Sequence, residues 1–138
     1  MAIYNTKKVF LIPIVFIIVV LITVYYLRHE YGLAQMESPT MEPIIHEKSN
    51  SSSIGDFILY RKHFKVSSLR SGDLVVVNLK TSYGNICTVR MIDNHSDSPS
   101  GFFYVVSVNQ KKHGIDSSSL GAIPSSDIIG KVVHIIKR

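Results

Sequence analysis

An uncharged apolar run near the N-terminus constrains this chain most. Residues 9–27 (VFLIPIVFIIVVLITVYYL) contain no charged side chain over 19 positions. A helix of this length is roughly 28 Å long, which is close to the thickness of the hydrocarbon core of a bilayer. The run has no polar face, and this argues against a helix packed inside a soluble fold. The sequence therefore predicts a transmembrane anchor at residues 9–27.

The alternative is a cleaved signal peptide. Small residues at Gly32 and Ala34 resemble a cleavage site. However, the apolar region of a signal peptide usually has about 7–15 residues, and this run is longer. We therefore favour an anchor that stays in the protein.

Charge on either side of the run predicts its orientation. Lys7 and Lys8 precede it, whereas Arg28 on the other side is offset by Glu30. The positive-inside rule then keeps residues 1–8 in the cytoplasm and carries residues 28–138 across the membrane. We expect a single-pass membrane protein with its C-terminal domain on the non-cytoplasmic side.

Residues 28–138 have the pattern of a small β domain. Short runs rich in β-branched residues alternate with turn signals. The predicted strands cover residues 56–60, 73–77, 86–92, 102–108 and 128–136. Gly130 inside the last run indicates a bulge or a close approach of backbones. The fold class is mainly β, with an antiparallel sheet or partly closed barrel after the transmembrane helix.

Composition excludes several classes of function. Cys87 is the only cysteine, so a disulfide scaffold is excluded. After residue 28, 12 Lys and Arg stand against 10 Asp and Glu, which is a weak basis for nucleic-acid binding. The six histidines are scattered, and no CxxC grouping occurs, so we expect no metal site. No glycine-rich phosphate loop is present either, and no cofactor is predicted.

Several short motifs occur together in a fixed order. They are residues 38–43 (SPTMEP), 54–62 (IGDFILYRK), 71–77 (SGDLVVV), 89–92 (VRMI), 116–117 (DS), 121–124 (GAIP) and 127–132 (DIIGKV). In this order the chain resembles the type I signal peptidase family of membrane serine proteases, over nearly its whole length. The resemblance implies a β-rich peptidase domain at the outer membrane face. Such enzymes cut signal peptides after small residues, with a serine nucleophile and a lysine general base.

The resemblance places the catalytic positions, and two of them are altered. Thr40 stands at the position of the family's nucleophilic serine, in Thr-Met-Glu-Pro. Its hydroxyl can attack a carbonyl, but its extra methyl group restricts the side chain. Ser38 stands where the family places a hydroxyl that helps to bind the oxyanion. Val89 stands at the position of the lysine base, and valine cannot accept a proton.

Two residues would support this centre, and two others depart from the family. Arg90 and Asp116 match supporting positions, with Asp116 held by Arg90 or by backbone amides. Gly114 replaces a serine that would hydrogen-bond the lysine, and Ser118 replaces an arginine that would pair with the aspartate.

A relocated base is the remaining route to activity. Lys80 and His113 are the candidates, if the strand register brings either of them to the centre. Cys87 shares a strand face with Val89, and we expect it to be a small buried core residue rather than a nucleophile.

We expect substrate to bind to the extended segment that follows the anchor and to the predicted strand at residues 56–60. Met41, Pro43 and Ile58 are the expected contacts, in a groove that takes up extended peptides by strand addition.

Two hypotheses follow. In the first, the protein is a signal-peptidase-like endopeptidase that processes, or at least binds, the signal peptides of exported proteins. In the second, it is an inactive relative that acts as a membrane-tethered peptide-binding or accessory module. The expected partners are signal peptides, membrane lipid and, in the second hypothesis, an active signal peptidase.

Overall fold

The structure is a computed structural model that describes residues 6–36, 41, 44, 55–93, 99–109 and 114–137, with side chains from residue 11 onward. The chain divides into two compact units, Met1–Glu30 and Tyr31–Arg138. We call them the helix unit and the β unit. The predicted start of the domain at residue 28 lies three positions before this division.

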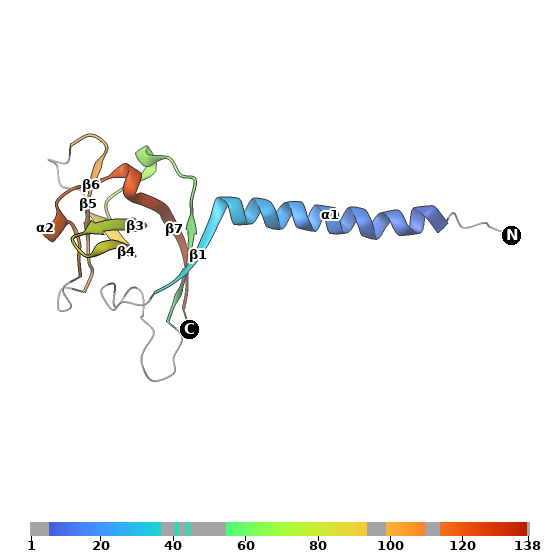
Figure 1. Cartoon of the computed structure of the whole chain (residues 1–138), viewed down its shortest axis with the longest axis horizontal. Coiled ribbons are helices and arrows are strands. Elements are labelled where there is room, and N and C mark those ends of the chain that lie inside the picture. The colour runs from blue at the N-terminus through green and yellow to red at the C-terminus, as the bar shows by residue number, and fades with distance from the viewer. Residues whose placement is uncertain are drawn as a thin grey trace. The chain divides into compact units, whose positions relative to one another are not determined.

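The helix unit contains one long helix, α1 (Thr6–Glu30, Figure 1). Within its segment Leu11–Glu30, an 18-residue stretch has a mean hydropathy of 2.5, and the segment is long and apolar enough to cross a membrane. Pro13 lies inside the helix, and the Thr23 hydroxyl donates to the Val19 carbonyl oxygen at 2.8 Å. Both features are tolerated in membrane helices. The helix extends beyond the predicted residues 9–27 at both ends.

The β unit is built on one antiparallel sheet of seven strands, in the spatial order β1-β2-β7-β3-β4-β5-β6 (Figure 1). The strands are β1 (Tyr31–Gln35), β2 (Phe57–Arg61), β3 (Leu74–Thr81), β4 (Gly84–Asp93), β5 (Phe102–Val106), β6 (Ile123–Pro124) and β7 (Ile128–Ile136). Three short helical turns accompany them: η2 (Val66–Ser68), α2 (Ser117–Leu120) and η3 (Ser125–Asp127). The terminal strands β1 and β6 do not pair with each other, so the sheet is not closed.

All five predicted strands are confirmed, with ends shifted by a few residues. The sequence missed β1 because it follows α1 without a turn signal and includes a glycine and an alanine, which are weak strand formers. It also missed β6, which has only two residues.

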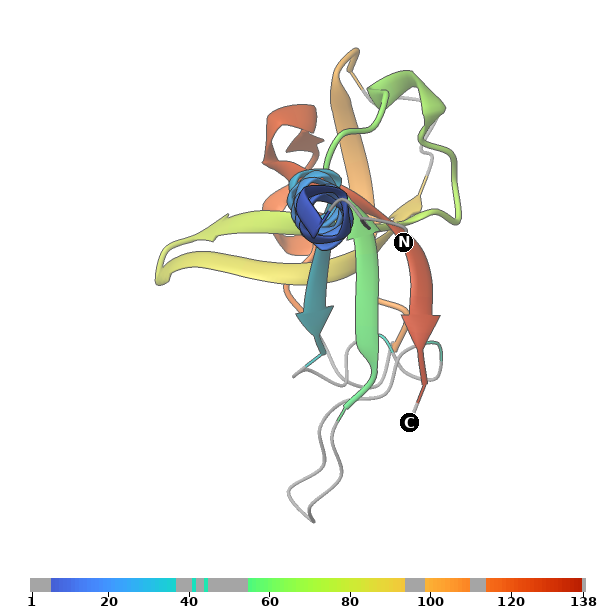
Figure 2. The ribbon, with the colours of Figure 1, turned by 90° about the vertical axis from the view of Figure 1, so that its right-hand side faces the viewer.

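Two irregularities bend the sheet. The register shifts between Leu59 and Tyr60 where β2 pairs with β7, and between Val76 and Val77 where β3 pairs with β7. Figure 2 shows the resulting change of direction, in which the β3–β4 hairpin crosses β2 and β7 at a steep angle. Bulges increase the local twist and bend of a strand. They account for the change of direction between the two parts of the sheet.

The bend leaves two hydrophobic clusters, one on each face of β3. The first cluster has Val75, Val77 and Leu79 of β3 at its centre, together with Leu69, Ile92, Val105, Ile123 and Ile128. The second cluster, which we call the Met41 cluster, consists of Met36, Met41, Ile58, Val76 and Val89. Because side chains alternate along a strand, Val75 and Val76 point to opposite clusters.

Candidate functional site

The two family positions on β4 lie on opposite faces of the sheet. In the β3–β4 register Val76 pairs with Val89, and Val75 pairs with Arg90. Val89 therefore belongs to the Met41 cluster, whereas Arg90 lies on the face of the first cluster. Both are buried, at 3% exposure each.

Val89 packs among hydrophobic side chains. These are the buried members of the Met41 cluster and, partly buried against them, side chains that include the ring of Tyr60. Met41 in this cluster directly follows Thr40 in the chain, and its own side chain is fully buried. The cluster thus joins the residue next to the nucleophile position with the residue at the base position. Ser38, Thr40 and Pro43 themselves lie outside the described residues.

Asp56 is a buried carboxylate, although the sequence pattern indicated only a turn residue at this position. It is 1% exposed, and its carbonyl oxygen accepts a 3.2 Å hydrogen bond from the Met36 backbone. It directly precedes β2, two residues before Ile58 of the Met41 cluster. The Gly-Asp signal marked the start of β2 to within one residue, but nothing local indicated burial.

Asp116 is held by backbone amides and serines. Its Oδ2 accepts from the Ser107 N–H at 3.0 Å, and its Oδ1 accepts from the Ser118 N–H at 2.9 Å and the Ser118 hydroxyl at 2.5 Å. It also caps the short helix α2. Burial by itself would raise the pKa of Asp116, but these hydrogen bonds outweigh burial and hold the pKa below its ordinary value. Ser118 therefore supplies two of the hydrogen-bond donors to this carboxylate.

Arg90 fixes the loop that carries Asp116. Its Nε donates to the Ile115 carbonyl oxygen at 2.9 Å, and its Nη1 donates to the Val89 carbonyl oxygen at 2.7 Å. Burial lowers the pKa of the Arg90 guanidinium, and the nearby charge of Asp116 acts against this shift. The arginine thus links β4 to the segment before α2, which is a supporting role.

The candidates for a relocated base lie away from this centre or outside the described part. Lys80 pairs in register with Asn85, four positions along β4 from Val89. That separation is about 13 Å along the strand. Its ammonium is exposed and forms a 2.9 Å ion pair with Asp127. His113 lies outside the described residues.

The prediction that Cys87 is a buried core residue is wrong. Cys87 is exposed, because the outer part of the β3–β4 hairpin extends past the Met41 cluster. Partial burial nevertheless raises the pKa of its thiol, which makes the reactive thiolate scarcer at neutral pH.

Among the described strands, none pairs with β4 beside Val89 on the side away from β3, and we call this side the open edge of β4. From Met91 to Asp93 the strand pairs with β5, but for Gly84–Val89 the described strands include a partner on only one side, β3. An open edge presents backbone donors and acceptors to an extended peptide. Met41 and Ile58, the predicted substrate contacts, are both fully buried in the cluster behind this edge.

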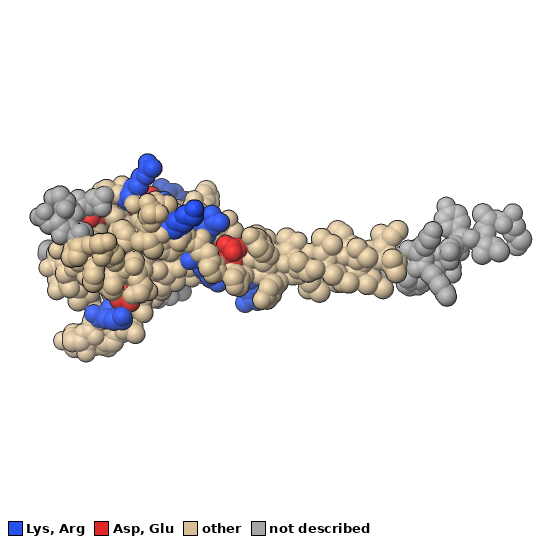
Figure 3. Space-filling view, turned by 90° about the horizontal axis from the view of Figure 1, so that it is seen from above, with Lys and Arg blue, Asp and Glu red and all other residues tan. Residues whose placement is uncertain are grey.

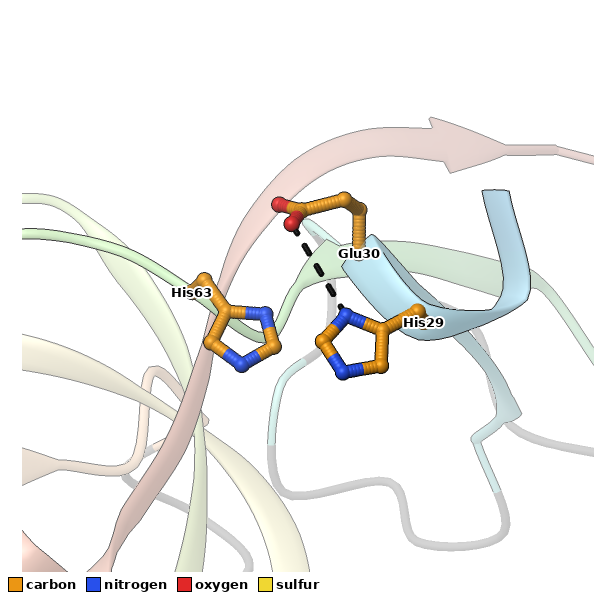
Figure 4. Close-up of side chains that lie close together, drawn as sticks. All are labelled: His29, Glu30 and His63. Carbon is orange, nitrogen blue, oxygen red and sulfur yellow. Dashed lines mark ion pairs between the residues drawn. The ribbon is translucent and has the colours of Figure 1, made fainter. Parts of the chain in front are cut away.

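The end of the helix unit carries metal-ligating side chains of its own. The His29 imidazole and the Glu30 carboxylate form an ion pair with Nδ1 and Oε1 3.9 Å apart (Figure 4). Figure 4 also draws His63, which belongs to the β unit. We assign no metal to these residues.

Comparison with protein-family models gave no match, and comparison with curated proteins gave none either.

Proposed function

We propose that this chain is a membrane-anchored, signal-peptidase-like module that binds signal peptides of exported proteins but has little or no peptidase activity. The observation that carries the proposal is the burial of Val89 in an apolar cluster at the position of the base. In addition, every lysine in the described part of the β unit is exposed or half-buried. A lysine acts as a general base at neutral pH when it is buried, and none of these lysines is fully buried.

The proposed binding site is the open edge of β4 at Gly84–Val89. A peptide that adds to this edge gains main-chain hydrogen bonds, while alternate side chains point toward the sheet. We propose that small residues are preferred there, as in the family that the chain resembles. Met41 and Ile58 have no exposed surface and would support this edge from inside the core.

The position of β1 supports an anchor that is retained. In β1, Ala34 pairs with Ile58 and Gly32 pairs with Tyr60. Cleavage at the small residues would remove most of this strand from the sheet. We propose that α1 spans the membrane with the β unit on the non-cytoplasmic side. An active signal peptidase at the same membrane face is a second proposed partner.

A gain-of-function experiment tests the missing base. We expect Thr40→Ser and Val89→Lys together to create signal-peptide cleavage, while each single change stays near background. A lysine at position 89 would be buried and would have a lowered pKa, as a base requires. The matched control combines Thr40→Ser with Cys87→Lys. That lysine lies on the same strand face but is exposed, so it should not support cleavage.

General-base assistance contributes about 10²–10⁴-fold, and the members of such a centre act as a unit. Adding Gly114→Ser to the active pair should raise the rate further by restoring a hydrogen-bond partner for the lysine. If the wild-type protein cleaves efficiently and Thr40→Ala abolishes the cleavage, the chain is an enzyme and the proposal fails. Asp56→Asn, Lys80→Ala and His113→Ala would then identify the base.

Binding is tested separately with the purified full chain in detergent. Thr40→Ala should bind a signal peptide as tightly as the wild type, because binding needs no nucleophile. Replacement of the small peptide residues by Trp or Arg, or methylation of the peptide backbone, should weaken binding. If neither change to the peptide weakens binding, the proposal of strand addition at β4 is contradicted.

A further inference from the structure

A basic hollow lies on the β unit beside the end of β2. Its volume is about 710 Å³, and it is formed mainly by the segment that follows β2, together with Lys131 and Val133 of β7. Figure 3 shows Lys and Arg side chains gathered on part of the surface of the β unit. Neither the peptide-binding edge of β4 nor the Met41 cluster contributes a residue to this hollow.

The charge of the hollow is strongly one-sided. Its lining includes four cationic side chains, Arg61, Lys62, Lys65 and Lys131, and no acidic one among the described residues. Asp73 beside it binds the Lys131 ammonium at 2.7 Å. Burial by itself would raise the pKa of Asp73, but the hydrogen bond from Lys131 helps to hold the pKa below its ordinary value. Even with Asp73 counted, the lining keeps a net positive charge, so the hollow attracts anions.

The hollow also has apolar walls. Phe64 is half-buried, whereas Val133 is 48% exposed and Val66 on the neighbouring turn is 40% exposed. Long cationic side chains next to exposed apolar groups are typical of surfaces that meet the polar and apolar layers of a membrane.

The sheet register places the hollow at a specific end of the β unit. Tyr31, the residue that directly follows α1 in the chain, pairs with Arg61, and Arg61 pairs with Lys131 on its other side. Adjacent strands are about 5 Å apart, so Arg61 and Lys131 lie within about 10 Å of the point where the chain leaves α1. If α1 spans a membrane, this end of the β unit is close to the lipid headgroups.

We propose that this hollow docks the β unit onto anionic phospholipid headgroups of the membrane that holds α1. The phosphate groups would meet Arg61, Lys62 and Lys65, and the exposed valines would reach the boundary of the acyl chains. Docking of this kind would limit the orientations of the β4 edge above the membrane. The inference rests on the proposed membrane insertion of α1 but not on peptide binding.

Hydrogen exchange of the full chain in lipid nanodiscs tests the proposal. Backbone amides of residues 62–69 should exchange more slowly in nanodiscs that contain phosphatidylglycerol than in phosphatidylcholine alone. At about 1 M salt the difference should disappear, because charges are then screened beyond about 3 Å. Incorporation of the protein into both nanodiscs checks insertion of α1 independently, so failure of insertion is distinguishable from failure of docking.

The variant Lys62→Gln/Lys65→Gln should lose the lipid-dependent protection. Each basic residue near an anionic surface contributes about 1 kcal/mol, so docking should become about 30-fold less favourable. The matched control, Lys80→Gln/Lys137→Gln, removes the same charge from exposed positions outside the hollow and should keep the protection. Circular dichroism verifies that both variants fold.

Two results would overturn the proposal. The first is equal exchange of residues 62–69 in both lipids, or protection that the Lys62/Lys65 variant keeps. The second is full protection by inorganic phosphate in phosphatidylcholine nanodiscs, which would assign the hollow to a soluble anion instead of a lipid.

Discussion

At the scale of single residues, Asp116 is a carboxylate whose charge is balanced by local hydrogen bonds. Both of its carboxylate oxygens accept hydrogen bonds from Ser107 or Ser118. A carboxylate with several donors is stabilised in its charged form. Asp116 is therefore held in its charged form by serine and backbone donors.

The hydrogen bonds of Asp116 predict a pH-dependent contribution to stability. Because its folded-state pKa lies below the ordinary value of 3.8, this contribution is present above that pH and is lost as the pH falls through the folded-state pKa. We expect Asp116→Asn to cost about 1–3 kcal/mol at neutral pH, since an amide NH₂ would face a backbone donor.

Urea unfolding of the full chain in detergent, followed by circular dichroism, measures this effect. The difference in the free energy of unfolding between the wild type and Asp116→Asn should become smaller in acid. A variant in the exposed Lys80–Asp127 ion pair, Asp127→Asn, serves as the control and should cost at most about 1 kcal/mol. If the free-energy cost of Asp116→Asn does not change with pH, the lowered pKa of Asp116 is contradicted.

At the scale of elements, Tyr60 ties three strands together. Its ring, on β2, covers Gly32 of β1 and Gly130 of β7. A Cβ atom built on Gly32 would lie 2.1 Å from the Tyr60 Cζ, and one built on Gly130 would lie 2.4 Å from the Tyr60 Cδ2. The prediction of a close approach at Gly130 is therefore confirmed, and its glycine is needed because a ring occupies the space of a side chain.

The two glycines should respond differently to substitution. We expect Gly32→Ala and Gly130→Ala each to cost about 1–3 kcal/mol by overpacking. Combination with Tyr60→Leu should rescue much of the loss at Gly32, where the closest contacts are ring atoms. It should rescue less at Gly130, where the new Cβ would also lie 2.7 Å from the Arg61 carbonyl oxygen.

Thermal unfolding of the four variants and of Tyr60→Leu alone gives the double-mutant cycles. Equal rescue at both glycines would show that the backbone near Arg61 moves to accommodate the new Cβ, and the carbonyl contact would then not distinguish the two positions.

At the scale of the whole molecule, the apolar helix and the charges around it predict the topology. A reporter fused after Arg138 should be active only on the non-cytoplasmic side, because the positive-inside rule predicts that Lys7 and Lys8 stay in the cytoplasm. Lys7→Gln/Lys8→Gln should give a mixed orientation. If the protein resists alkaline carbonate extraction but its reporter is active in the cytoplasm, the predicted orientation is wrong and the prediction of an anchor stands.

The amino-acid sequence by itself determined the long helix and five of the strands of this protein. The uncharged run predicted α1, and alternating β-branched runs with Gly-Asp turns predicted β2, β3, β4, β5 and β7, because these signals are local. The sequence also contains, in a fixed order, the short motifs on which the family resemblance rests.

Only the tertiary structure decided which residues meet. The register of β3 and β4 placed Val89 opposite Val76, and the packing of the fold brought Val89 to Met41, which is 48 positions away in the chain. Cys87 is exposed because the β3–β4 hairpin extends beyond the core. The pairing of β1 with β2 and of β2 with β7 brought together the basic residues of the hollow. These features depend on long-range pairing and on the bends that bulges introduce, and local patterns carry no information about either.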